Sequence, residues 1–397
     1  MTAERAAVIS GAGRSVIGRR LGIPDLTLTV DAALRAIADA GLEPADIDGL
    51  ATYTGELPGP RPGGFFGYSG SPTRDVVDAL RLQLNWWSAG HEGPSQLVSL
   101  FHAILAVSAG LARHVLVYRT QTETSFAAAA RSGGEPPTYP SAWFGDWGRP
   151  MHVHAAVNWI ALMADRYQQT YGLTPEALAA IVLNNRSNAG LNDAAVYRSP
   201  LTLDQYFDSP MVSSPLRLLD CDVPVDGSCA LIVSSVSTAR DAPGPVARVE
   251  AIGTGISTRP TIDQMEDLAL SAAWKPAQQM WSRTSLLPSD VDVAYPYDGF
   301  SFMVIQWLEA LGFCGQGEGG DLVRDASVIG LHGSLPINTD GGHLSAGRTH
   351  GHGAVIEAFD QLRGTAGARQ VTDAEVAVVT SGGGVSSQGC LLLSRLA

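Results

Sequence analysis

Residues 338–353 read NTDGGHLSAGRTHGHG, and this stretch carries more information than any other part of the 397-residue chain. It holds five glycines and three of the nine histidines, and an apolar helical pattern begins directly after it. Glycine serves where the backbone takes positive φ or approaches another group closely, and histidine moves protons near neutral pH. The density of both residue types favours an active-site loop over the alternative, a flexible loop that caps the next helix.

The chain around this loop alternates between strand-like and helix-like segments. The pattern predicts strands at 6–10, 47–53, 114–119, 230–235, 247–252, 291–295, 375–381 and 389–396, and helices at 26–40, 96–109, 155–171, 175–184, 262–281, 300–311 and 353–363. Such alternation predicts an α/β architecture with largely parallel sheets. The length and the repeated order of elements indicate two related halves, 1–245 and 246–397, with an insertion at about 120–218 in the first.

Composition and charge narrow the class of protein. Hydrophobic residues make up 45% and charged residues 16% of the chain, as in a well-buried globular protein. No segment reaches the roughly 18 uninterrupted apolar residues that a membrane span requires. The first residues lack a signal-peptide pattern, so we expect a soluble cytoplasmic protein. The formal net charge of −13 argues against nucleic-acid binding, which needs basic surface to neutralise phosphate.

Two kinds of nucleophile are scarce. Lys275 is the only lysine, so Schiff-base chemistry at any other position is excluded. The four cysteines have no CxxC spacing, which predicts neither a zinc site nor a disulfide framework. We expect all four to be buried free thiols: Cys221, Cys229, Cys314 and Cys390.

One glycine pattern suggests a dinucleotide site and one histidine cluster suggests a metal site, but the surrounding sequence supports neither. Gly11–Gly13 follows the first strand, but the third glycine of a dinucleotide-binding turn would fall on Val16 and no helix follows at once. A tight strand exit is the better interpretation. The histidines of 338–353 have no carboxylate at HExxH spacing, so we expect no metal site.

Residues 85–96, NWWSAGHEGPSQ, precede an apolar helix and form a second candidate segment. A helix entered through Gly93 presents free backbone N–H groups, which suit an anionic or developing oxyanion centre. His91 and Glu92 lie just upstream. An ordinary capped helix with a surface histidine explains this segment equally well.

Tyr297 lies in the segment YPYDGFS, at the carboxyl end of a predicted strand and just before a helix. Ligands collect at this edge of α/β sheets. The tyrosine is therefore either a packing aromatic or a proton donor whose phenol a cation activates.

These segments, in this order, resemble the thiolase superfamily, in particular the sterol carrier protein X thiolase domain and the lipid-transfer-protein-like steroid side-chain aldolases. The resemblance covers nearly the whole chain. It implies a layered α-β-α-β-α core of duplicated βαβαβαββ halves with a loop-domain insertion in the N-terminal half. It rests on 7–18, 84–119, 163–192, 214–235, 297–301 (the family's HDCFS segment) and 338–353 (its NxxGGxxxxGH loop).

The departures from the thiolase pattern decide the chemistry. Gly93 takes the place of the nucleophilic cysteine, 380–384 lack the second cysteine, and Tyr297 replaces the first histidine. Without a thiolate no acyl-enzyme forms, so a Claisen-type thiolase reaction is not expected. The side-chain aldolases share this pattern and have a GGxLSxGYxHG loop, where this chain reads GGHLSAGRTHG with Arg348 in place of the second tyrosine.

The resemblance implies a retro-aldol carbon–carbon lyase that acts on a β-hydroxyacyl-CoA with a steroid or bile-acid side chain. A base would remove the hydroxyl proton, and oxyanion donors would hold the thioester enolate. Tyr297 and His350 are the candidates for proton transfer. Arg348 would lower the pKa of Tyr297 or stabilise the enolate.

The resemblance gives further residues weaker roles. The backbone near Gly93 and Gly342 would supply oxyanion donors, and His91, Asp298 and His343 would bind substrate. Two arginines of the insertion are candidates for the CoA phosphates, where bidentate guanidinium binding is favoured. These two residues are Arg186 and Arg198. The alternative to CoA binding for each of them is a solvated arginine on the surface.

Family members form homodimers, and the aldolases associate with a small OB-fold and zinc-ribbon protein, so the resemblance implies both partners here. It implies no cofactor beyond the CoA of the substrate. Two other classes of function remain open: a non-catalytic subunit that binds acyl-CoA or lipid, and an acyltransferase that works without a cysteine.

Overall fold

The computed structural model describes residues 2–53, 70–90, 95–132, 153, 155–239, 242–256, 265–382 and 387–396. Its strands are β1 Ala7–Arg14, β2 Gly49–Tyr53, β3 Trp86–Gly90, β4 His114–Thr122, β5 Met211–Ser213, β6 Leu216–Arg217, β7 Asp226–Ser235, β8 Val246–Ile256, β9 Val293–Tyr295, β10 Val376–Ser381 and β11 Ser387–Leu396. Its helices are α1 Asp25–Asp39, α2 Thr73–Leu80, α3 Val98–Ser108, α4 Glu123–Ser132, α6 Ala156–Tyr171, α7 Pro175–Gly190, α8 Leu203–Asp208, α9 Trp274–Trp281, α10 Ser301–Ala310, α11 Gly319–Arg324, α12 Ala326–Ile329 and α13 His352–Leu362.

The main sheet has the strand order β3-β2-β4-β7-β1-β8-β11-β10-β9. Among the described strands, parallel pairing is confined to β2 with β3, β2 with β4, and β9 with β10. The prediction of largely parallel sheets is therefore wrong. One reason is that β10 and β11 follow each other closely in the chain, and a short connection can only join antiparallel neighbours.

The strand order repeats along the chain. Numbered by their order in each part, the strands from β1 to β7 run 3-2-4-5-1 across the sheet. Those from β8 to β11 run 1-5-4-2-3 when the isolated parallel bridge of Ile337 to Ala294 of β9 is counted as the third member. The two series meet where Val8 and Ile9 of β1 pair with Arg248 and Ala247 of β8. Because this pairing makes the sheet continuous, the division of the chain at residue 245 stays a prediction.

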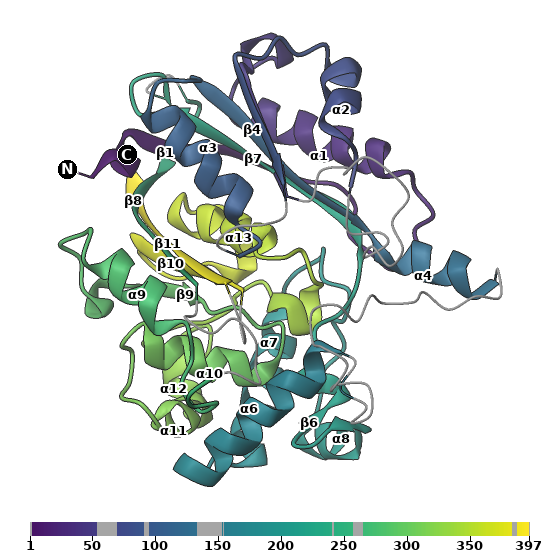
Figure 1. Ribbon diagram of the computed structural model, residues 1–397, viewed down its shortest axis with the longest axis vertical. Helices are drawn as coiled ribbons and strands as arrows, with labels where there is room; N and C mark the ends of the chain where they lie inside the picture. Colours follow the sequence, from purple (N-terminus) through teal and green to yellow (C-terminus); the bar gives the residue numbers. More distant parts are fainter. Residues whose placement is uncertain are drawn as a thin grey trace.

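The buried side chains divide the molecule into five layers. On β7, Ile232 packs with α1 in one apolar cluster, whereas Leu231 belongs to the cluster around α3 and α13. On β11, Leu391 faces this same central helix layer, and Leu392 packs with α9 and α10 on the other side. Successive strand residues point to opposite faces, so each sheet part is covered twice. The α-β-α-β-α layering is thus confirmed, and Figure 1 shows α3 and α13 between the two sheet parts.

The segment between β4 and β7 holds α6, α7, α8 and the β5–β6 hairpin. In Figure 1 these elements lie together below the sheet, beside α10 to α12. Helix α7 contacts α10, α11 and the π-helical turn Gly342–Ala346. The insertion therefore lies against the glycine-rich loop as well as against the core.

One predicted helix is much shorter than expected. Of 262–281, only α9, Trp274–Trp281, is helical; 262–264 lie outside the described residues and 265–273 form turns. The Asp267 carboxylate accepts the Ala269 N–H at 2.9 Å, and the Ser271 hydroxyl accepts the Ala273 N–H at 3.0 Å. Such local side-chain bonds compete with the helical backbone bonds.

Gly11 and Gly13 do not form a strand exit, because both lie within β1, next to a bulge. They let α1 approach the strand. A Cβ atom on Gly11 would lie 2.4 Å from the Ala36 carbonyl oxygen, and one on Gly13 would lie 2.3 Å from the Ala32 carbonyl oxygen. Close contact between helix and strand therefore explains these glycines.

We predict that Gly13→Ala lowers the free energy of unfolding by about 1–3 kcal/mol, because the added methyl group forces α1 away from the sheet. Urea denaturation followed by circular dichroism measures this change. Gly244→Ala is the matched control, since a Cβ there meets nothing within 4 Å. Equal stability of the two variants would contradict the close packing of α1.

Candidate active site

The glycine-rich loop is held between two parts of the core. At its start, the Asn338 N–H donates to the Ala294 carbonyl of β9 at 3.0 Å. Further along, Arg348 donates its N–H to Val223 at 2.8 Å, and Val223 donates to the His343 carbonyl at 2.9 Å. The loop therefore connects the end of β9 with the segment that leads into β7.

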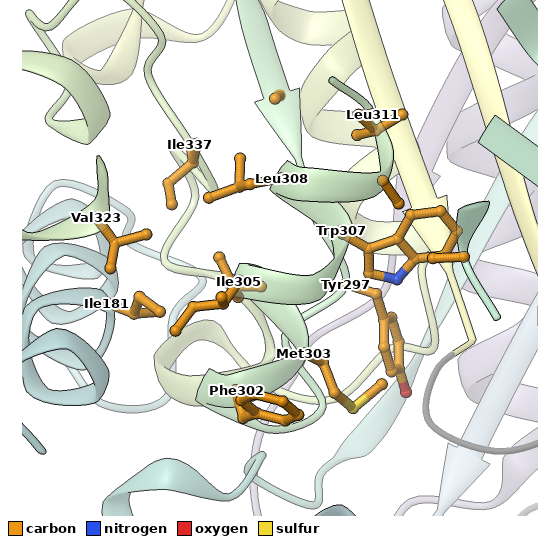
Figure 2. Close-up of a cluster of buried hydrophobic side chains, with 14 of the residues drawn as sticks. Ile181, Tyr297, Phe302, Met303, Ile305, Trp307, Leu308, Leu311, Val323 and Ile337 are labelled. Atoms are coloured by element: carbon orange, nitrogen blue, oxygen red, sulfur yellow. The ribbon is translucent and has the colours of Figure 1, made fainter. Parts of the chain in front are cut away.

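Tyr297 lies just after β9, and both predicted roles of this residue fit its surroundings. Its ring belongs to the apolar cluster with Met303 and Trp307, and Figure 2 shows the phenol oxygen at the end of the ring that points away from Trp307. The hydroxyl lies 3.4 Å from Gln96 Nε2. Burial raises the pKa of Tyr297, Asp222 raises it further, and Arg348 opposes the shift. The phenol is therefore protonated at neutral pH.

Asp298 joins the loop to the core. Its carboxylate accepts the backbone N–H groups of His343 and Leu344 at 2.9 and 3.1 Å, and the side-chain amide of Asn185 on α7 at 2.7 Å. It also lies 2.6 Å from His343 Nδ1. Because Asp298 is fully buried, these bonds satisfy a charge that would otherwise be costly.

The His343 imidazole lies beside Tyr297, with ring centroids 4.8 Å apart. Burial alone would lower the pKa of His343, but the Asp298 carboxylate outweighs this effect and raises it. The Gly351 N–H, however, donates to His343 Nε2 at 3.1 Å. In this arrangement Nε2 carries no proton and Nδ1–H donates to Asp298, so His343 fixes the loop rather than offering a proton.

His350 has a different environment. Its Nδ1 atom lies 2.9 Å from Arg119 Nη2 and also contacts the Gln121 amide. Its backbone is left-handed, with φ of 50°, which turns the ring towards β4. Burial and the charge of Arg119 lower the pKa of His350 well below its usual value. The ring is therefore neutral at physiological pH.

Arg348 belongs to a partly buried ionic cluster. Its guanidinium contacts both carboxylate oxygens of Glu123 at 2.7 and 2.6 Å, and one oxygen of Asp222 at 2.9 Å. Burial raises the pKa of Asp222, although Arg348 opposes this effect. Two carboxylates on one guanidinium can hold a net negative charge close to Tyr297.

Several predicted site residues lie elsewhere or have other partners. The Gly342 N–H donates to Asp340 at 2.9 Å, and the role of the backbone near Gly342 as an oxyanion donor stays a prediction. Its lack of a side chain matters, because a Cβ would lie 2.1 Å from Asp298 Oδ2 at φ of 59°. His91 and Gly93 lie outside the described residues.

The two arginines predicted to bind CoA differ from each other. Arg186 is buried on α7, donates to Ser345 at 3.0 Å and packs over the Tyr197 ring. It is thus no solvated surface arginine, and its contacts favour a structural role under the loop. Arg198 is exposed and pairs with Asp193 at 2.6 Å. A phosphate-binding role for Arg198 stays a prediction.

Four residues of this site escape sequence reasoning: Arg119, Gln121, Glu123 and Asp222. The first three come from β4 and the start of α4, and Asp222 lies in the segment before β7. An Arg-x-Gln-x-Glu run has alternate side chains on one face of a strand, which is a usable but weak signal. Only the pairing of β4 with β7 brings these residues towards the loop.

No described cysteine has the properties of a nucleophile. Cys229 and Cys390 are buried, but Cys221 and Cys314 are partly exposed, which corrects the prediction for these two. Burial raises the pKa of Cys229 to about 11, that of Cys221 and Cys314 to about 12, and that of Cys390 higher still. Thiols with raised pKa values are poorly reactive near neutral pH.

Other chemistries find little support within the described ranges. Lys275 lies on α9 and donates to the Ile256 carbonyl at 3.3 Å. No group of three His, Cys, Asp or Glu side chains with metal-binding geometry occurs in the part of the chain that the structure describes. None of the described helices is long and apolar enough to span a bilayer.

A cavity of about 10 Å³ lies beside Tyr297, Asp298 and His343. This volume suits about one water molecule. It is far too small for an acyl thioester.

The chain is similar to known proteins in both sequence and structure. The profile described as "Thiolase C-terminal domain-like" matches residues 254–395. The chain is 33% identical to the "Steroid side-chain-cleaving aldolase" of Thermomonospora curvata, over 98% of this chain and 97% of that protein. It is 31% identical to the "17-hydroxy-3-oxo-4-pregnene-20-carboxyl-CoA lyase" of Mycobacterium tuberculosis, over 97% and 98%. A solved "Ltp2-ChsH2(DUF35) aldolase" is similar in structure, with a TM-score of 0.85, 32% identity and 98% coverage of both chains.

We predict that Asp298→Asn destabilises the protein by about 3–5 kcal/mol, because the new amide NH₂ group meets N–H donors and the charge opposite His343 is lost. Thermal and urea unfolding measure this loss. Asp208→Asn, at an exposed position of α8, is the control and should change stability by less than about 0.5 kcal/mol. A similarly small effect at Asp298 would remove it as the support of the loop.

Proposed function

This chain belongs to the steroid side-chain-cleaving aldolases of the thiolase superfamily, and we propose that it is a carbon–carbon lyase. Its reaction is the retro-aldol cleavage of a β-hydroxyacyl-CoA into a ketone or aldehyde and a shorter acyl-CoA. The observation that carries this proposal is a site with a buried phenol, a neutral imidazole and a carboxylate–arginine cluster, without an activated thiol. Such a site suits proton transfer and enolate stabilisation and does not suit acyl-enzyme formation.

The reaction needs one proton acceptor and at least one hydrogen-bond donor. The β-hydroxyl loses its proton, its C–O bond becomes a carbonyl, and the electrons of the Cα–Cβ bond pass into the thioester enolate. A carboxylate of the cluster formed by Asp222, Glu123 and Arg348 accepts this first proton. The Tyr297 phenol, kept protonated by burial, donates to the enolate and returns a proton to the α carbon. No further cofactor is required, because the thioester itself delocalises the charge.

The substrate class follows from the relatives. Both curated relatives described above carry names that refer to steroid side chains or a pregnene carboxyl-CoA. A steroid or bile-acid side chain attached to CoA is therefore the substrate that we propose. The length match over 97–98% of each relative supports the same overall activity.

We also propose a homodimer in the cytoplasm that forms across the edge strand β3. One edge of β3 pairs with β2, and no strand pairs with its other edge among the described residues. Trp87 on this strand is 62% exposed, and Leu105 on α3 and Leu111 just after α3 are about half exposed. A bare strand edge with exposed apolar side chains favours pairing with a second copy.

An OB-fold and zinc-ribbon partner is the further association that we propose. The name of the structural relative joins two components, Ltp2 and ChsH2(DUF35), which supports a partner for this chain as well. Co-expression with the gene of such a neighbour, followed by affinity purification of one component, tests the association.

We predict that Tyr297→Phe lowers the lyase rate about 100-fold or more, because the donor of the α-carbon proton is lost. The assay incubates the purified chain, with and without its OB-fold neighbour, with a steroid β-hydroxyacyl-CoA and follows release of the shorter acyl-CoA. Tyr171→Phe, in α6, is the matched control, because its hydroxyl is bonded to Gln316 outside the site.

The same assay separates the other two functions. Tight binding of the CoA thioester without turnover, with and without the partner, would favour a non-catalytic binding subunit. Release of free CoA with a ketoacyl product would favour an acyltransferase. An unchanged rate in Tyr297→Phe would remove Tyr297 from the mechanism.

For the dimer, Trp87→Glu should give a monomer in sedimentation velocity, because a charge on the edge strand blocks pairing. Leu287→Glu is the control, since Leu287 is equally exposed but lies at a distant turn. A wild-type monomer, or a Trp87→Glu dimer, would contradict this interface.

A further inference from the structure

Two carboxylates share the Arg348 guanidinium, but they do so unequally. Glu123 uses both of its oxygens, which lie 2.7 and 2.6 Å from Arg348 Nη2. Asp222 uses only Oδ1, which lies 2.9 Å from Arg348 Nη1. Its second oxygen, Oδ2, accepts no hydrogen bond from any residue that the structure describes. Because a carboxylate oxygen needs a free lone pair to accept a proton, Asp222 is the better placed of the two.

The backbone of Asp222 is fixed on two sides. Its N–H donates to the Gly299 carbonyl at 3.1 Å, and the residue before it forms an antiparallel bridge with Phe300. The next residue, Val223, donates to the His343 carbonyl at 2.9 Å. The Asp222 side chain therefore starts from a rigid position between the segment that follows β9 and the glycine-rich loop.

The charges of the site place the same carboxylate next to the proton donor. Among the charged groups that act on Tyr297, Asp222 has the largest effect on the pKa of the phenol, so the two side chains lie close together. Glu123 comes from the start of α4 and reaches this region through Arg348, which bridges the two carboxylates. Asp222 is thus the carboxylate on the Tyr297 side of the cluster.

Asp222 faces charged or titratable groups from three parts of the chain: Arg348 and His343 on the loop, Glu123 on α4, and Tyr297 after β9. Burial raises the pKa of Asp222, and the charge of Glu123 adds to this effect. Arg348 and His343 oppose it, but the pKa remains above its usual value. A carboxylate with a raised pKa is a stronger base than an ordinary one, which suits general-base catalysis.

We propose that Asp222 is the catalytic proton acceptor of the lyase, and that Glu123 is a positioning residue that holds Arg348 and shares its charge. This inference rests on the proposed lyase function and assigns one atom to its first step. The β-hydroxyl O–H bond breaks and its proton passes to Asp222 Oδ2, while the C–O bond becomes a carbonyl and the Cα–Cβ electron pair enters the thioester enolate. Tyr297 then gives its proton to the α carbon. Asp222 loses its proton to solvent and the Tyr297 phenolate takes one up, so no proton is consumed overall.

The first test compares the two carboxylates of the cluster. Asp222→Asn keeps a side-chain oxygen for Arg348 but cannot take up a proton, so we expect kcat of the lyase to fall about 100-fold or more. Glu123→Gln should lose less than about tenfold, because it removes only a support of Arg348. Asp208→Asn, at its exposed position on α8, is the control and should keep the wild-type rate. Equal losses in the two cluster variants would overturn the assignment.

The second test uses the pH profile of kcat/KM in a variant that keeps Asp222, so it decides the question even if Asp222→Asn does not fold. Asp222 must be ionised to accept a proton, and activity is therefore lost as the pH falls through its pKa. Glu123→Gln removes a negative charge that raises this pKa, so the acid limb should move to lower pH. A merely structural defect would lower the rate at every pH and leave the limb in place.

Glu375→Gln, at an exposed position just before β10, is the matched control for the pH profile and should not move the acid limb. A limb that stays in place in Glu123→Gln, or that moves to higher pH, would overturn the role of Asp222.

The wild type separates this assignment from the function on which it rests. A wild type that releases no shorter acyl-CoA, alone and with its OB-fold neighbour, would overturn the lyase function and the assignment with it. An active wild type whose folded Asp222→Asn variant is equally active would leave the lyase function in place and overturn the assignment alone.

Discussion

The arrangement of the site depends on one buried carboxylate. Asp298 accepts two backbone N–H groups of the loop, the imidazole of His343 and the amide of Asn185. These donors come from the glycine-rich loop and from α7, so a single side chain joins the insertion, the loop and the end of β9. A charge buried at 1% exposure is stable only while such donors surround it. The loop conformation and the burial of the Asp298 carboxylate therefore require each other.

This constraint extends along the loop to the chemistry. His343 uses one ring nitrogen for Asp298 and the other for the Gly351 N–H, so its two bonds transmit the position of Asp298 to the residue after His350. His350 then meets Arg119, which reaches the site from the opposite sheet part. The imidazole is held from both sides, because the loop lies between two rigid elements that are far apart in the sequence. A site on such supports keeps its geometry without help from the substrate.

The sequence predicts one part of this site much better than the other. Tyr297, Asp298 and His343 lie in contiguous motifs at a strand end and in a glycine-rich loop, so local pattern was enough to select them. Arg119 and Glu123 show only a weak alternating pattern and Asp222 shows none, and the pairing of β4 with β7 is what brings them towards the loop. The layered core was predictable from alternation and resemblance, whereas strand direction was not. The partner of the Gly342 N–H is unpredictable for a related reason, because it depends on how the loop folds back on Asp340.

Arg348 explains how a site without a second tyrosine can still separate donors from acceptors. A partly buried guanidinium alone would carry a desolvation penalty, and Glu123 and Asp222 offset it. Two carboxylates on one cation leave negative charge beside Tyr297, which helps to keep the phenol protonated. Under the proposed reaction, Tyr297 then acts as a donor, and the carboxylates take the substrate proton. In that proposal, an ionic cluster built on Arg348 supplies the proton acceptor, and the phenol of Tyr297 supplies the donor.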